Sequence, residues 1–345
     1  MPVRIPQYFS CFSPAARRWV PVASRPIQSP GVQSSAQGNT PRSHFNIVSW
    51  NIDYSSSYPT RRCLDLINHV FKYGVPDILC LQEVRSEVRA SLLGNREIRQ
   101  AFLTTDAATD LEYKRFITMT LLSKERFAYS LDSKEMGGSN DEGKFIVGPV
   151  FREHLPSAAG RDGLCVDLIP PCAPDTFLRI INAHLESCDG FSYRAAQLKQ
   201  LSSVLHEPGC SGGLIVGDFN SVTDDDRLLI EENKLKDAWL TLHGDTKPDA
   251  PTWSVGRRRD PRYEPSRLDK VAMMEIQSAH DREDSMKGIR DFDDIMSLIN
   301  AGDNVQYTPK EREKYKRAFG EFVETYIEQN PKWTLAQWKK NTNLE

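Results

Sequence analysis

The feature that most limits the fold of this chain is its series of short apolar segments, which do not alternate strictly with helices. Amphipathic periodicity predicts helices at 59–73, with Gly74 as a stop, and at 190–205. Because several strands follow one another without a helix, the pattern favours an α/β sandwich of two sheets over a doubly wound parallel sheet. β-branched and aromatic residues predict the strands at 45–50, 77–81, 116–122, 144–150, 164–169, 177–183 and 213–216.

Composition divides the 345 residues into three regions. The chain is 39% hydrophobic, enough for one large core, since single cores seldom exceed about 250–300 residues. Residues 44–274 contain the predicted strands and are expected to form the sandwich. Residues 275–345 are expected to form a charged helical tail. Its aromatic stripe is either a packed helix face or a partner-binding surface, and consists of Tyr315, Phe319, Phe322 and Tyr326.

Residues 1–43 are expected to form a disordered leader, with ordered structure beginning at His44. The first 44 residues contain five Arg, many Ser, Pro and Gln, and no Asp or Glu, a composition typical of segments that do not fold. An acid-free leader with Arg and Ser is also typical of a mitochondrial presequence. Pro14, Pro21 and Pro26 would interrupt a long amphipathic helix there.

Charge and cysteine spacing exclude several classes of protein. A formal net charge of -3 excludes a uniformly basic nucleic-acid-binding protein but allows a local basic patch. The seven cysteines are scattered, which indicates free thiols in a reducing compartment. No apolar stretch reaches the roughly 18 residues of a membrane span, so no membrane partner is expected. The expected location is the nucleus or cytoplasm, or the mitochondrion if the leader is a presequence.

Polar clusters follow four of the predicted strands. Taken singly, each has an ordinary structural interpretation as a turn, a helix cap or a core histidine. Because ligand-binding groups gather at strand ends in α/β folds, four clusters in one chain indicate a functional site. The clusters are Asn51 with Asp53, Gln82 with Glu83, His184 with Glu186 and Ser187, and Asp218 with Asn220.

These clusters carry a family resemblance that runs from residue 45 to residue 273. The strings WNID, LQEV, HLES, GDFN and RLDKV resemble, in this order, the endonuclease/exonuclease/phosphatase family. Together with Arg194 and Gln197 in the following helix and Pro251-Thr252-Trp253, they are most similar to the tyrosyl-DNA phosphodiesterase 2-like branch. The resemblance implies the two-sheet sandwich and a metal-dependent phosphodiesterase. Enzymes of that branch remove tyrosine from a 5′ DNA phosphate, which implies a DNA partner and a role in DNA repair.

The residue types suit this chemistry. Glu83 is a natural ligand for a hard cation that keeps several waters, which implies Mg²⁺ or Mn²⁺. The resemblance adds Asp53 to the metal site and makes Asp218 the general base that activates water. Asn51 and His184 are expected to donate hydrogen bonds to phosphoryl oxygens as charge builds. Asn220 is expected to hold Asp218 or to contact the phosphate. The remaining residues expected at the substrate are Glu186, Ser187, Arg194 and Asp269.

In one respect the sequence departs from the family. The family closes its last core strand with Ser-Asp-His, and this chain has no such string. The last core strand is therefore expected to be missing or diverged, and His280 is either a substitute or a surface residue. A site without that donor is expected to be about a hundredfold less active. The basic run at 257–259 is either a solvated loop or a clamp for the phosphate backbone.

Three functions remain open from the sequence. The first is a Mg²⁺-dependent phosphodiesterase acting on 5′-phosphotyrosyl or related DNA ends. The second is a phosphatase acting on a small molecule or an inositol phosphate with the same fold. The third is a catalytically weak family member that acts as a binding protein, because a fold alone does not fix a substrate.

Overall fold

The computed structural model describes residues 3–27, 45–107, 114–131, 143–243, 251–253 and 266–274. The chain divides into two compact units, residues 1–250 with 266–299 and residues 251–265 with 300–345. The strands and helices given below belong to the first unit. The predicted tail at 275–345 and its aromatic stripe lie outside the described residues.

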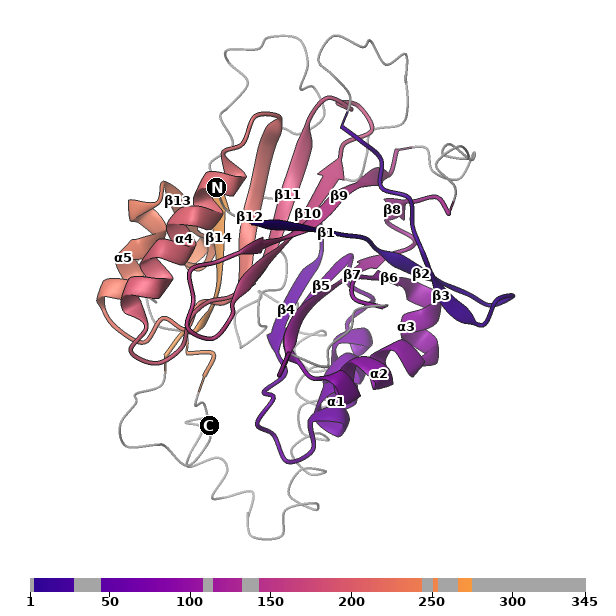
Figure 1. The fold of residues 1–345 in the computed structure, drawn as a ribbon, viewed down its shortest axis with the longest axis horizontal. Coiled ribbons are helices and arrows are strands. Elements are labelled where there is room, and N and C mark those ends of the chain that lie inside the picture. The colour runs from indigo at the N-terminus through magenta and orange to yellow at the C-terminus, as the bar shows by residue number, and fades with distance from the viewer. Residues whose placement is uncertain are drawn as a thin grey trace, which may run out of the picture. The chain divides into compact units, whose positions relative to one another are not determined.

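Two mixed β-sheets form the frame of the first unit, so the predicted α/β sandwich is confirmed (Figure 1). The 8-stranded sheet runs in the order β1 (Arg4–Gln7), β9 (Phe145–His154), β10 (Asp162–Ile169), β11 (Phe177–His184), β12 (Cys210–Asp218), β14 (Asp269–Met274) and β13 (Leu235–Asp237), with β8 (Phe127–Ala128) beside β9. The 6-stranded sheet runs in the order β3 (Arg18–Pro21), β2 (Ser10–Ser13), β6 (Phe102–Thr104), β7 (Ile117–Ser123), β5 (Ile78–Val84) and β4 (Ile47–Asn51). The parallel pairs are β11 with β12, β4 with β5, and β8 with β9.

Helices cover the outer face of each sheet (Figure 1). On the larger sheet, Leu201 and Leu229 pack against Ile215 of β12. On the smaller sheet, Ile67 and Leu92 lie in one apolar cluster with residues of β5 and β7. None of the described helices is long and apolar enough to cross a membrane. The helices are α1 (Pro59–Lys72), α2 (Ser86–Gly94), α3 (Arg96–Ala101), α4 (Phe191–Leu205), α5 (Asp225–Glu232) and α6 (Ala238–His243).

The alternation of side chains along each strand separates the core between the sheets from the cores under the helices. On β5, Ile78 and Cys80 lie in the cluster between the sheets. Leu79 and Leu81 lie in the cluster formed with the helices. Both faces of these strands are covered, and their sequences are continuous apolar runs for that reason.

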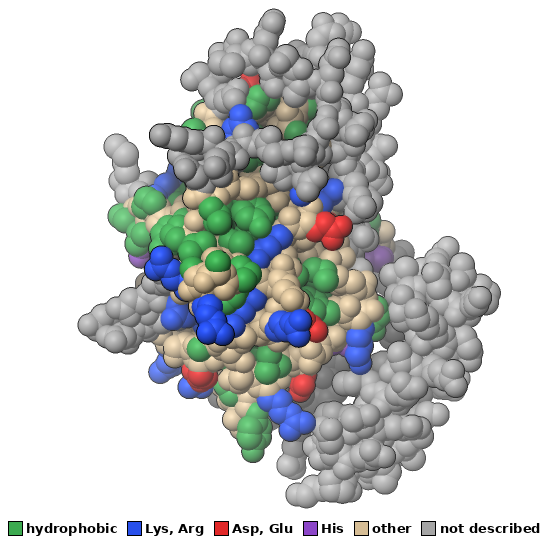
Figure 2. Space-filling model, turned by 90° about the vertical axis from the view of Figure 1, so that its right-hand side faces the viewer, with side chains coloured by type: hydrophobic (Ala, Val, Ile, Leu, Met, Phe, Trp, Pro, Cys, Tyr) green, Lys and Arg blue, Asp and Glu red, His purple; other side chains and the backbone are tan. Residues whose placement is uncertain are grey.

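The expectation of a disordered leader is wrong for residues 3–27. β1 pairs with β9 at the edge of the larger sheet, and the β2–β3 hairpin joins the smaller sheet through β6. Phe9 is 1% exposed and lies in the core between the sheets. Arg4 forms an ion pair of 2.7 Å with Glu153. On the side of the molecule where Figure 1 places the hairpin, Lys and Arg side chains lie around an exposed apolar area (Figure 2).

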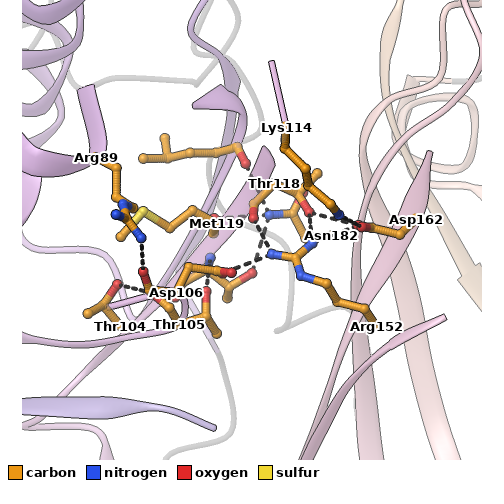
Figure 3. Close-up of polar contacts among 12 residues, drawn as sticks. Arg89, Thr104, Thr105, Asp106, Lys114, Thr118, Met119, Arg152, Asp162 and Asn182 are labelled. Atoms are coloured by element: carbon orange, nitrogen blue, oxygen red, sulfur yellow. Dashed lines mark hydrogen bonds and ion pairs between the residues drawn. The ribbon is translucent and has the colours of Figure 1, made fainter. Parts of the chain in front are cut away.

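A buried ionic network joins the two sheets (Figure 3). Arg152 of β9 donates to Asp162 of its own sheet at 2.6 Å and to Asp106, which follows β6 of the other sheet, at 2.8 Å. It also donates to the hydroxyl of Thr118 at 2.9 Å and to its carbonyl at 2.7 Å. Lys114 adds a bond of 3.0 Å to Asp162. The buried guanidinium is thus paired on both sides, which a buried charge requires.

Candidate active site

Side chains alternate between the two faces of a strand. On the central strands, the face that lines the core between the sheets ends in polar residues. On β11, the core residue Ile180 is followed on the same face by Asn182 and then by His184. Asp218 occupies the corresponding end of β12, directly opposite His184 in the parallel pairing. Asn51 ends β4 on the facing sheet. Two sheets therefore bring three of the predicted clusters to one place.

A layer of buried amides separates these polar ends from the apolar core. Asn182 donates to the carbonyl of Met119 at 3.0 Å and to the hydroxyl of Thr120 at 3.2 Å, so it bridges the sheets (Figure 3). Gln82 of β5 donates to Asn182 at 2.9 Å and to Ser49 of β4 at 3.0 Å. These bonds fix the spacing of the sheets beneath the site.

Glu83 reaches the site through a break in its strand. On an unbroken strand it would share the helix-facing side with Leu81. The pairing of β5 with β7 shifts register between Leu81 and Val84, and Glu83 has a φ of 59°. Bulges of this kind re-aim a side chain. The carboxylate accepts a hydrogen bond of 2.7 Å from the backbone of Tyr54, which follows the WNID motif.

Asp218 is held at both carboxylate oxygens. Asn51 donates to Oδ2 at 2.8 Å, and the backbone amide of Asn220 donates to Oδ1 at 2.8 Å. The side chain of Asn220 is turned away and donates to the carbonyl of Leu185 at 2.9 Å. The contact that Asn220 makes with Asp218 therefore comes from its backbone amide and not from its side chain. The remaining lone pairs of the Asp218 carboxylate can accept a proton from water.

His184 has a defined tautomer. Its Nδ1 lies 2.9 Å from Nη1 of Arg161. Because a guanidinium can only donate, Nδ1 must accept, and the ring proton sits on Nε2. Nε2 lies 3.7 Å from Glu83 and 3.8 Å from Asp218, too far for a hydrogen bond. Burial lowers the pKa of His184 to about 4, so the ring is a neutral donor at neutral pH.

Sequence reasoning missed Arg161 and the aromatic residue beside it. Arg161, in the turn between β9 and β10, is 7% exposed. Its guanidinium lies 5.2 Å from the ring centre of Phe116, which stacks on His184 at 5.7 Å. Tyr54 packs on Phe116 at 4.9 Å, and the exposed Arg115 lies over Tyr54 at 5.6 Å. None of these side chains belongs to a motif: Tyr54 follows the WNID string directly, whereas Arg115, Phe116 and Arg161 are brought to the site by the pairing of distant strands.

Three predicted site residues have left-handed backbones. The φ angles are 66° for Asp53, 59° for Glu83 and 49° for Asn220. A residue other than glycine in this region costs about 1–3 kcal/mol, least for Asn and Asp. Such strain persists only where the surrounding structure imposes it, and it gathers at functional sites.

The charge of the site fits a divalent cation. Burial raises the pKa of Glu83, and the nearby carboxylates of Asp218 and Asp53 raise it further, against hydrogen bonds from Tyr54 and Asn51. In the described part of the chain, neither Glu83 nor Asp218 forms an ion pair with Lys or Arg. No group of three His, Cys, Asp or Glu side chains forms a closed metal site among the described residues. Mg²⁺ commonly uses only one or two carboxylates and keeps its waters, so Glu83 with Asp53 suits it.

The four residues expected at the substrate differ in their placement. Asp269 lies opposite Asp218 on β14, and Ser187 is half-buried after β11. The Glu186 carboxylate is bonded to the turn at residues 157–159. The expectation that Arg194 binds substrate is wrong. Its side chain is 1% exposed and is committed to Asp226 at 2.6 Å and to the carbonyls of Glu186 and Cys188.

Two further predictions fall outside the described residues. They concern the basic run at 257–259 and His280. Trp253 is described, but it belongs to the second compact unit and is not placed relative to this site.

A two-sheet sandwich with Asn, Glu, His and Asp at the strand ends defines a class of phosphoesterases. The sequence profile of the Endonuclease/Exonuclease/phosphatase family matches residues 48–274. The chain belongs to this family, and its reaction class is the hydrolysis of phosphoric esters. No curated protein sequence matches the chain.

Solved structures with similar folds include TDP2 of D. rerio complexed with a single-strand DNA product. The alignment has 20% sequence identity and a TM-score of 0.50, and it covers 68% of this chain and 85% of that one. Truncated C. elegans TDP2 aligns at 20% identity and a TM-score of 0.47 over 67% of this chain and 84% of that one. The human Nocturnin catalytic domain aligns at 18% identity and a TM-score of 0.46 over 68% and 84%. At these identities the likeness is one of fold.

Proposed function

We propose that this chain is a divalent-metal-dependent phosphodiesterase that hydrolyses 5′-phosphotyrosyl or related adducts at DNA ends, as a step of DNA repair. The observation that carries the proposal is the convergence of Asn51, Glu83, His184 and Asp218 from four strands of two sheets. Each has a distinct chemical task in the displacement of a group from phosphorus by water.

Asp218 is the general base. Its two oxygens are held by Asn51 and Asn220, so the orientation of the carboxylate is fixed. A carboxylate in this state orients a water molecule and accepts its proton as the water attacks phosphorus.

His184 donates to the phosphoryl oxygen. Its Nε2–H lies between Glu83 and Asp218 without bonding either, so it remains free to donate to an oxygen placed there. Because burial keeps the ring neutral, the donor does not lose its proton to the neighbouring carboxylates. Charge that builds on the phosphoryl oxygens strengthens this bond in the transition state.

Glu83, with Asp53 beside it, would hold the cation, which supplies neutralisation of phosphate charge when bound. A tyrosine leaves as a phenolate with a pKa of about 10, so it needs less protonation than an alkoxide. A site with one strong base and neutral donors suits such a leaving group.

The DNA part of the proposal is supported by the surroundings of the site. The half-buried Tyr54, directly after the WNID motif, and the exposed Arg115 form an aromatic and cationic pair. Aromatic faces stack on bases and Arg contacts phosphates in single-strand binding. The D. rerio TDP2 structure carries a single-strand DNA product, and we extend that ligand class to this chain as part of the proposal.

The test is a substrate comparison with the full chain. Rates at 0 and saturating Mg²⁺ are measured for a 5′-phosphotyrosyl oligonucleotide, free phosphotyrosine and an inositol phosphate. We expect metal-dependent turnover of the oligonucleotide with the highest kcat/KM. A higher kcat/KM on the inositol phosphate would assign the chain to small-molecule phosphatases. Absence of turnover on all three would contradict the proposal.

A further inference from the structure

Glu186 lies two residues after His184, yet its carboxylate is turned into protein. Its Oε2 accepts a hydrogen bond of 2.6 Å from the hydroxyl of Ser157. It also accepts bonds of 2.9 and 3.3 Å from the backbone amides of Ala158 and Ala159. A carboxylate that accepts three bonds from one turn fixes the shape of that turn.

Ser157 connects the Glu186 carboxylate to the backbone of Arg161 through hydrogen bonds. The Ser157 hydroxyl donates to Glu186 and accepts from the backbone amide of Arg161 at 3.0 Å. Gly160 between them has a φ of 71°, which closes the turn. Arg161 then places Nη1 at 2.9 Å from Nδ1 of His184. The chain of contacts runs from Glu186 through Ser157 and Arg161 to the ring.

Helix α4 holds Glu186 in this position. Gln197 accepts from the backbone amide of Glu186 at 2.8 Å and donates to the carbonyl of Pro156 at 2.8 Å. Arg194 donates to the Glu186 carbonyl at 3.1 Å and is itself anchored by Asp226. The strand end and the turn are therefore fixed to one helix.

We propose that Glu186 is a positioning residue, which holds Arg161 on His184 through the turn at 157–161 and so keeps the His184 proton on Nε2. The effect on rate rests on the proposed function, whereas the effect on the tautomer does not. Without the turn, Arg161 leaves Nδ1, and that nitrogen can carry the proton instead. The donor toward the phosphate is then lost in part of the molecules.

The first measurement is the tautomer of His184, read from the ¹⁵N shifts of the ring in the metal-free full chain. We expect Nε2–H in the wild type and a mixture with Nδ1–H in Glu186→Ala. Glu186→Gln should restore the wild-type shifts, because its amide oxygen can still accept from the turn. Should Glu186→Ala not fold, Ser157→Ala breaks the same chain of contacts at its middle.

The matched control is Asp167→Asn. Asp167 is a buried carboxylate on β10 that holds Arg179 at 2.6 Å. Both of its carboxylate oxygens accept from Arg179 rather than from the turn, so its substitution should lower stability and leave the His184 shifts unchanged.

The second measurement is kcat on the 5′-phosphotyrosyl oligonucleotide. Misplacement of a donor by about 1 Å can cost 10²-fold, so we expect kcat to fall by about 10–100-fold in Glu186→Ala and Ser157→Ala. The kcat of the double variant should be no lower than that of the single variants, because both substitutions break the same chain of contacts.

The two measurements separate the inference from the proposed function. A changed tautomer in a chain without turnover upholds the positioning role and contradicts the phosphodiesterase. Wild-type His184 shifts in both Glu186→Ala and Ser157→Ala would overturn the positioning role, whatever the rates.

Discussion

At the scale of single residues, Glu83 combines three unfavourable features. Its backbone is left-handed, its side chain is only 14% exposed, and two carboxylates lie close enough to raise its pKa beyond the effect of burial. Residues with this combination are retained for function rather than for stability. A bound cation would attract these carboxylates and so offset the repulsion between them.

We therefore expect Glu83→Gln to leave the metal-free protein at least as stable as the wild type. Saturating Mg²⁺, at a hundred times its dissociation constant, should stabilise the wild type by about 2.7 kcal/mol and the variant much less. In a domain of this size each kcal/mol shifts the melting temperature by roughly 2–4 °C, which thermal unfolding detects. The exposed Glu87→Gln is the matched control. An equal Mg²⁺ shift in Glu83→Gln would remove it from the metal site.

Residues differ in how far the sequence predicts them. Asn51, Glu83, His184 and Asp218 follow apolar strands in recognisable strings, so their convergence could be predicted from the motifs. Arg161 could not, because its place depends on a turn that is bonded to a residue 27 to 29 positions later, and no local signal marks it. The family resemblance predicts Arg194 at the substrate, whereas in the structure its side chain holds a strand end.

At the scale of elements, the close approach of β11 and β12 depends on Gly217. A Cβ built there would lie 2.0 Å from the carbonyl oxygen of Ala183, and the φ of 140° disfavours any other residue. The approach brings His184 and Asp218 side by side in the next pair of the ladder. The placement of His184 beside Asp218 therefore depends on the backbone contact between Ala183 and Gly217, one residue earlier on each strand.

Gly217→Ala should destabilise the chain by on the order of 3 kcal/mol or more, because the clash is with backbone and cannot be relieved by a side-chain rotation. Chemical denaturation with a midpoint and slope measures this. Gly94→Ala, at the end of α2, is the control, since nothing lies within 4 Å of its added Cβ. A change below about 1 kcal/mol at Gly217 would show that the strands can separate without loss.

The N-terminal strands show where prediction from the sequence fails at this scale. β1, β2 and β3 have four residues each, and β1 contains Pro6. Such short segments bury little apolar surface by themselves, so their sequences do not predict a strand. Their partners are remote, since Arg4 pairs with Glu153 across 149 positions. The central strands, buried on both faces, carry continuous apolar runs and were predictable.

At the scale of the whole molecule, Lys270 sets part of the pH dependence of stability. It is 4% exposed on β14. Its pKa is lowered to about 8, chiefly by burial; Arg267 and Arg227 also lower the pKa, and Asp237 and Asp226 oppose them. Between this value and the ordinary pKa of 10.5, the unfolded chain binds a proton that the folded chain does not. The free energy of unfolding therefore rises with pH across that window. Below the window Lys270 is charged in the folded chain, so the full cost of burying that charge lowers the stability.

Lys270→Met should remove this slope and raise stability at neutral pH by on the order of 1–3 kcal/mol. Denaturation curves at several values between pH 7 and pH 10 give both quantities. The exposed Lys199→Met on α4 should keep the wild-type slope. A slope that persists in Lys270→Met would assign the pH dependence to another group.

The rate of Asp218→Asn on a 5′-phosphotyrosyl oligonucleotide at saturating Mg²⁺ shows whether Asp218 activates water. Asn keeps the shape and one of the two anchoring contacts, because its amide oxygen accepts at one position while its amide nitrogen can only donate, and it cannot take a proton from water. We predict that kcat falls by about 10²–10⁴-fold, the range of a positioned acid–base group, while the oligonucleotide still binds. An unchanged kcat, with or without weaker binding, would contradict the claim that Asp218 activates water at these strand ends.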